Sequence, residues 1–164
     1  MDLKRVGDKA LLNDFTYFNM NLSKKLAFYL PHNLEFYGGG DRWKLYSCSV
    51  EGAVLLKNGL HDLVVHEDNV GSEYAPILKP MDKIGERSPT HDGSFWTEIE
   101  QDFAPPMTDL MYGFSKHGMY LSFENSLGFK QSAEIGVWER LFELHFDGFG
   151  FIGKGVAVDD YSIS

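Results

Sequence analysis

The stretch from Ala133 to Val158 constrains the fold most, because it gathers bulky apolar side chains into a short span punctuated by glycines. The bulky residues are Trp138, Leu141, Phe142, Leu144, Phe146, Phe149, Phe151 and Ile152. The glycines are Gly148, Gly150, Gly153 and Gly155. The rest of the chain is organised around this span, and the period of its apolar residues decides between helix and strand.

A helical period runs through the first half of this stretch. Residues at steps of three and four would form one stripe of an amphipathic helix. The members of this stripe are Ile135, Trp138, Leu141, Phe142 and His145. In this interpretation Glu139, Arg140 and Glu143 face water, and the segment carries no chemistry.

A strand period fits the residues from Leu141 to Asp147 as well. Alternation would place Glu143, His145 and Asp147 on one face of that strand. An imidazole between two carboxylates suits general acid and base catalysis or a divalent cation, but a half-exposed strand also carries polar residues on its wet side. We expect a helix from about Ala133 to about Arg140, followed by this strand.

Length and composition indicate one globular domain over residues 1–164. The 13 Phe, 8 Tyr and 3 Trp predict a packed interior and argue against disorder. Cys48 is the single cysteine, so an internal disulfide is excluded and a reducing compartment is indicated. The N-terminus has no secretory pattern and no run of about 18 apolar residues occurs, so we expect a soluble, cytoplasmic protein.

Negative charge is concentrated in the middle of the chain. The net charge is −9, and residues 61–110 hold 11 Asp and Glu against three Lys and Arg. Such a surface repels phosphate backbones and anionic membranes and attracts a basic partner. The alternative is that the excess acid serves solubility alone.

Local signals predict two β-hairpins, because strand-forming runs flank glycine turns. In chain order the strands and turns are Asn33–Tyr37, Gly38–Asp41, Trp43–Val50, Ala53–Leu56, Asn58-Gly59 and Leu60–His66. Further strands are expected at Met119–Glu124 and in one last short strand formed by Gly155–Val158 and Tyr161–Ile163. One long helix or two short helices are expected from Asp8 to about Leu30, where Pro31 ends them. Further helices are expected at Phe95–Phe103 and, as a short one, at Met107–Lys116.

These elements predict an α+β fold, in which N-terminal and C-terminal helices pack on a mostly antiparallel sheet. The segment Asp68–Ser94 carries three prolines and three glycines and is expected to be irregular. In the helix that follows it, Glu98 and Asp102 stack at a four-residue step. Their repulsion would be offset by a basic partner or simply by dissolved salt.

The residues predicted to bind a basic protein partner are Asp82, Glu86, Asp92, Trp96, Glu98, Glu100 and Asp102. Acidic residues would steer and pair with Lys and Arg, and the aromatic residue would anchor. The function expected first is therefore an acidic inhibitor that masks a basic toxin or nuclease, as immunity proteins do.

Two alternatives remain at this point. One is a hydrolase or transferase that uses Glu143, His145 and Asp147 as catalytic groups. The other is a structural subunit whose Gly- and Phe-rich tail adds a strand to a neighbour. The sequence contains no nucleophile elbow, Walker A loop, dinucleotide fingerprint, zincin motif or EF-hand loop, so no cofactor or metal is predicted. It leaves the oligomeric state open.

Overall fold

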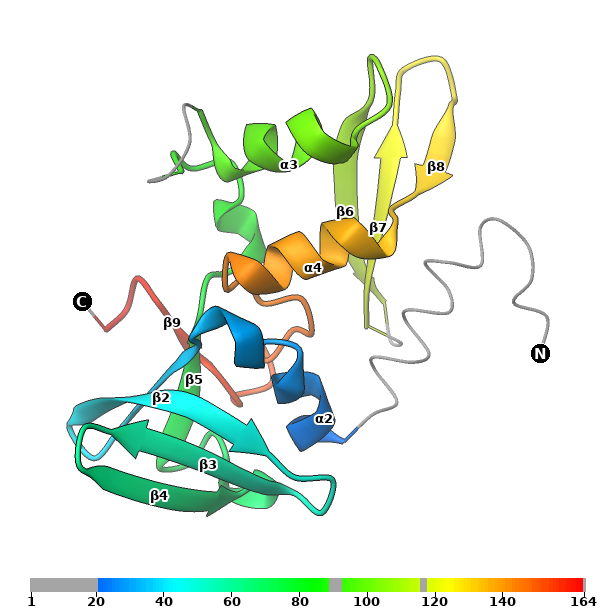
Figure 1. Cartoon of the computed structure of the whole chain (residues 1–164). Coiled ribbons are helices and arrows are strands. Elements are labelled where there is room, and N and C mark those ends of the chain that lie inside the picture. The colour runs from blue at the N-terminus through cyan, green and yellow to red at the C-terminus, as the bar shows by residue number, and fades with distance from the viewer. Residues whose placement is uncertain (1–20, 89–92, 116–117, 164) are drawn as a thin grey trace. The chain divides into compact units, whose positions relative to one another are not determined.

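Within the residues that the structure describes, two β-sheets carry the fold, one of six strands and one of three. The computed structural model describes residues 21–88, 93–115 and 118–163 (Figure 1). These residues fall into two compact units, whose boundaries lie at 80/81 and 140/141. We call residues 21–80 and 141–163 the large-sheet unit and the described part of 81–140 the small-sheet unit.

The large sheet has the strand order β4-β3-β2-β1-β5-β9, and only the pair β5–β9 is parallel. The strands are β1 (Glu35–Gly38), β2 (Asp41–Cys48), β3 (Ala53–Asn58), β4 (His61–His66), β5 (Tyr74–Leu78) and β9 (Val158–Asp159). Gly39, Gly40 and Gly59 all have positive φ, which tight hairpin turns require. Both predicted hairpins are confirmed.

Strand β5 lies in the segment that the sequence analysis treated as irregular, so that expectation is wrong at Tyr74–Leu78. Pro76 gave the wrong signal, because proline lacks an N–H and is disfavoured inside sheets. The ladder explains how it is tolerated. Tyr37 faces Ala75 in a hydrogen-bonded pair, so the next residue, Pro76, turns its nitrogen away from β1.

Helix α2 (Leu22–Ala27) packs beside β2. Asn21 caps it by accepting a hydrogen bond from the Lys24 N–H, and the Ser23 hydroxyl donates to the Ser49 carbonyl at 2.8 Å. The short 3₁₀ turn η1 (Leu30–His32) follows, with Pro31 in it. The helix therefore ends at Ala27, before the predicted end at Leu30, and Pro31 continues the chain as a 3₁₀ turn. Most of the predicted helix Asp8–Leu30 lies outside the described residues.

An aromatic cluster fills the core of the large-sheet unit. The rings of Phe142 and Phe149 stack with centroids 5.3 Å apart, and Tyr29 meets Phe142 edge-on at 5.0 Å. The buried Tyr29 hydroxyl donates to the Phe146 carbonyl at 2.6 Å. The Gly- and Phe-rich tail therefore folds back into its own unit, and β9 pairs with β5 of the same chain.

The small-sheet unit contains α3 (Phe95–Phe103) and a sheet of order β6-β7-β8. The strands are β6 (Asp109–Ser115), β7 (Gly118–Glu124) and β8 (Lys130–Ser132). The helix α3 and the strand Met119–Glu124 were predicted correctly, but the helix predicted at Met107–Lys116 is wrong. The apolar residues of this segment fit a helical or a strand period, and pairing of β6 with β7 over seven residue pairs decides for the strand. In one of these pairs the Tyr120 ring covers Gly113 directly opposite.

Helix α4 (Ile135–Glu143) ends in a Schellman motif. The Phe146 N–H bonds to the Leu141 carbonyl at 2.9 Å, and the His145 N–H bonds to Phe142 at 3.0 Å. His145 takes the left-handed conformation that this ending requires, with φ 64°. The strand predicted over Leu141–Asp147 is therefore wrong, because its first residues are helical and its middle reverses the chain.

The predicted fold class is confirmed: the structure is α+β, with a mostly antiparallel main sheet and helices from both parts of the chain. The single-domain organisation over residues 1–164 stays a prediction. Within the described residues no helix is both long and apolar enough to cross a membrane.

Candidate functional site

The three residues proposed as an alternative catalytic set do not share a strand face. Glu143 lies in the last turn of α4 and is exposed. His145 sits in the reversal, where its Nε2 contacts the His32 carbonyl. Asp147 is buried and accepts hydrogen bonds from the backbone N–H groups of Phe151 and Ile152 at 2.7 and 2.9 Å.

Burial is the largest cause of the pKa shifts of His145 and Asp147. Burial lowers the pKa of His145 and raises that of Asp147, while the N–H groups that Asp147 accepts from lower it in part. Both side chains are occupied with backbone groups that hold the chain after α4. The geometric premise of the catalytic alternative is therefore removed.

The predicted partner-binding residues that the structure describes all lie in the small-sheet unit, and Asp92 lies outside the described residues. Asp82 is exposed in the 3₁₀ turn η3 (Met81–Lys83), and Glu86 pairs with Lys83 at 3.3 Å.

Glu98 and Asp102 are compensated within the unit. Arg140 lies 3.9 Å from the Glu98 carboxylate and 3.0 Å from that of Asp102, and its guanidinium also lies over the Phe103 ring. Glu98 additionally accepts from the Ser88 hydroxyl at 3.0 Å. The repulsion between the stacked carboxylates is therefore offset by Arg140, whereas the sequence analysis considered only a partner or salt.

Glu100 lies on another side of α3, toward the edge of the small sheet. Its carboxylate accepts a hydrogen bond from the Leu110 N–H at 3.2 Å, at the start of β6. Burial raises the pKa of Glu100 and the nearby Asp109 adds to this, while hydrogen bonds from Leu110 and from the Trp96 side chain lower it. Trp96 is half-buried and its side chain hydrogen-bonds to Glu100, and its role as an anchor for a partner stays a prediction.

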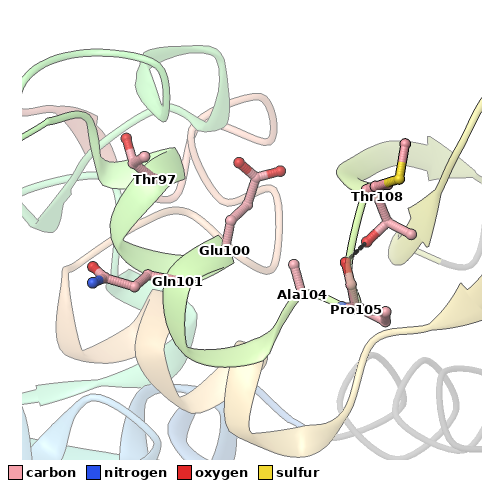
Figure 2. Close-up of a pocket in the computed structure, with 7 residues that line it drawn as sticks. Thr97, Glu100, Gln101, Ala104, Pro105 and Thr108 are labelled. Carbon is pink, nitrogen blue, oxygen red and sulfur yellow. Dashed lines mark hydrogen bonds between the residues drawn. The ribbon is translucent and has the colours of Figure 1, made fainter.

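A pocket of about 550 Å³ opens beside Glu100. Figure 2 shows Thr97, Glu100 and Gln101 on α3 and Ala104, Pro105 and Thr108 on the segment that follows it. Its lining residues are Thr97, Glu100, Gln101, Ala104, Pro105, Met107 and Thr108. Of these, the sequence analysis named only Glu100.

Local chemistry shapes this pocket. Ser94 and Thr97 form a capping box that fixes the start of α3. At the other end the helix stops before Pro105, whose carbonyl accepts a hydrogen bond from the Thr108 hydroxyl at 2.7 Å. Met107 has φ 61° and projects into solvent. The Pro105-Pro106 pair is a sequence signal that could have indicated this turn.

The pocket offers oxygen acceptors around one carboxylate. Among the described residues no Lys or Arg lies within 4.0 Å of Glu100. The arrangement fits a ligand group that donates hydrogen bonds and carries positive charge. In the part of the chain that the structure describes, no three His, Cys, Asp or Glu side chains gather closely enough to hold a metal ion.

Comparisons with protein-family models, with curated proteins and with solved structures found no match. The function is therefore argued from the geometry of the pocket and its surroundings.

Proposed function

We propose that this chain is a small acidic, cytoplasmic binding protein that neutralises a basic protein partner, in the manner of an immunity protein or an inhibitor of a nucleic-acid enzyme. Glu100 receives a Lys or Arg side chain of that partner in the pocket after α3. The observation that carries the proposal is a half-buried carboxylate in a pocket, with no cation of the described residues paired to it.

The geometry of Glu100 supports this role. One carboxylate oxygen, Oε2, accepts from the Leu110 N–H, so the side chain is held in place. An incoming ammonium or guanidinium group would donate further, charge-assisted hydrogen bonds to the carboxylate. Partial burial strengthens such a pair relative to one in open water. Thr97, Gln101 and Thr108 supply further oxygen acceptors around it.

The other predicted residues take different parts in this proposal. Asp82 and Glu86 are exposed, so they raise the association rate, and salt screens their effect. Glu98 and Asp102 contribute little to binding, because Arg140 already compensates them. The lone Cys48 supports the cytoplasmic location, since chains in reducing compartments rarely depend on disulfides.

A small probe tests the pocket before a partner is known. Nα-acetyl-lysine amide carries a single ammonium group and is titrated into the isotope-labelled full chain at low salt. Chemical shifts of Gln101 and Thr108 should change in the wild type and not in E100Q. The matched control E86Q removes an exposed carboxylate outside the pocket and should respond as the wild type does. Equal responses from E100Q and the wild type would contradict the proposal.

A partner captured from the native host at low and high salt extends the test. Replacing Glu100 by Gln should weaken its binding at least about tenfold, mostly through faster dissociation, because a desolvated ion pair is lost. E86Q should change the association rate alone, and less at high salt. A captured basic protein that binds wild type and E100Q equally would exclude the pocket as its site.

A further inference from the structure

Strand β4 (His61–His66) lies at one edge of the large sheet and pairs with β3 on its inner side (Figure 1). Asn58 and His61 flank a two-residue turn, so they form a hydrogen-bonded pair. Hydrogen-bonded pairs alternate along the ladder with pairs that are not hydrogen-bonded, and the bond from the Glu67 N–H to the Gly52 carbonyl at 2.7 Å fits this alternation at the other end of β4. The odd-numbered residues of β4 therefore bond to β3. Asp62, Val64 and His66 direct their backbone N–H and C=O groups to the open edge, where no described strand pairs with them.

The side chains of these three residues lie on the outer face of the sheet. Val64 is 65% exposed although it is a β-branched apolar residue in the middle of a strand. It stands in line with Leu55 and Ser47 on the two strands behind it. This row ends abruptly at the sheet edge, which leaves an apolar side chain and a set of backbone groups exposed together.

We propose that β4 pairs antiparallel with β4 of a second copy of this chain, about a two-fold axis through Val64. In this register Val64 faces Val64 of the second copy. Asp62 faces His66, and Leu63 faces Val65. Each pair of outward residues exchanges two backbone hydrogen bonds. The two large sheets then form one continuous sheet, and neither copy has an open edge at β4.

Charge complementarity selects this register. Asp62 and His66 stand symmetrically about Val64, so the two-fold axis places a carboxylate opposite an imidazole at both ends of the contact. Within its own chain, the His66 Nδ1 lies 3.2 Å from the Asp68 backbone nitrogen and 3.3 Å from the Asp68 carboxylate, so Nε2 is the ring nitrogen left to face Asp62 of the second copy. Asp62 lies 3.8 Å from Lys57 Nζ on the neighbouring strand, so the facing pair extends an existing row of charged groups. A shift by two residues would separate these groups and leave backbone groups of one outward residue unpaired.

Two features that often block edge pairing, a proline and a bulge, are missing from β4. Its six residues contain no proline, and its pairing with β3 has no bulge, whereas β2 carries a register shift between Leu45 and Ser47. The apolar row would also continue across the axis, with Leu55 and Val64 of each copy in sequence. Apolar contact and backbone pairing therefore favour the same occupant, a second copy.

Sedimentation equilibrium of the full chain over a range of concentrations tests the proposal. The expected species has twice the 18.6 kDa chain mass. V64K places two like charges directly opposite each other and should raise the dissociation constant about 100-fold. L60K is the matched control, because Leu60 is 99% exposed in the turn before β4 and should leave the mass unchanged. A wild-type monomer at every concentration, or a dimer that V64K does not weaken, would overturn the proposal.

Cysteine crosslinking tests the register in a C48S background. Facing residues of a hydrogen-bonded pair have Cα atoms about 5.5 Å apart, which suits a disulfide. V64C should therefore form a covalent dimer under mild oxidation, and L60C should not, although its position is more exposed. Faster crosslinking of L60C would mean that collisions alone join the chains. A charge swap tests the same register without crosslinking. D62K should weaken association, because it removes the carboxylate that faces His66 of the second copy. D62K combined with H66E should restore association, and failure of that rescue would exclude the proposed register.

Discussion

Arg140 is the residue whose removal tests the electrostatic account of α3 most directly. Its guanidinium pairs with Glu98 at 3.9 Å and with Asp102 at 3.0 Å. Methionine keeps an unbranched side chain that can still pack on Phe103, so R140M removes mainly the charge. The small-sheet unit should lose stability, because two carboxylates are left without their shared cation.

The magnitude follows from exposure. The Asp102 side chain is 49% exposed, so solvent screens its pair, which contributes about 0.5 kcal/mol. Glu98 is 15% exposed and loses about 1 kcal/mol of net interaction when its cation is removed. The uncovered repulsion between the two carboxylates adds a few tenths of a kcal/mol. R140M should therefore lower the free energy of unfolding by about 2 kcal/mol.

Urea unfolding followed by tryptophan fluorescence measures this change. K83M is the matched control, since the Lys83–Glu86 pair is exposed and should contribute less than about 0.5 kcal/mol. D102N combined with R140M should show a coupling of about 0.5 kcal/mol in a double-mutant cycle. If R140M destabilises no more than K83M does, the compensation of Glu98 and Asp102 by Arg140 is refuted, and both carboxylates return as candidates for partner binding.

Two further predictions concern the chain after α4. Asp147→Ala should lower the free energy of unfolding by about 3 kcal/mol in urea, because two backbone N–H groups lose a charged acceptor. The control Asp159→Ala removes the acceptor of one exposed hydrogen bond and should cost less than about 1 kcal/mol. Equal effects would contradict the role of the buried Asp147 carboxylate in holding these N–H groups. His145→Ala should be less stable than His145→Gly by about 1 kcal/mol, since only glycine takes a left-handed φ without strain. The reverse order would show that the helix ending does not determine the residue at this position.

Local signals in the sequence predicted much of the large sheet. Asn58-Gly59 and the glycines at 38–40 mark tight turns between alternating runs, and tight turns depend on a few adjacent residues. The same kind of reasoning failed at Leu141–Asp147. There the alternation was present in the sequence, but the same residues form the end of an amphipathic helix and its Schellman motif.

The candidate site was predicted only in part, because its decisive contacts join residues far apart in sequence. Glu100 was named for its charge, yet its role depends on Leu110 and on the turn after Pro105, which no period reveals. Arg140 was assigned to a solvated helix face. Its pairing with Glu98 and Asp102 appears only once α3 and the first part of α4 lie together within the small-sheet unit.

The order of the two units along the chain has a consequence for synthesis. The large-sheet unit consists of residues 21–80 and 141–163, so the whole small-sheet unit is made before the large-sheet unit is complete. Val158 pairs with Ile77, about 80 residues earlier. Strand β5 therefore leaves the ribosome with one side uncovered and keeps it so until the last segment emerges. That interval is when a nascent chain is most exposed to chaperones and to misassembly.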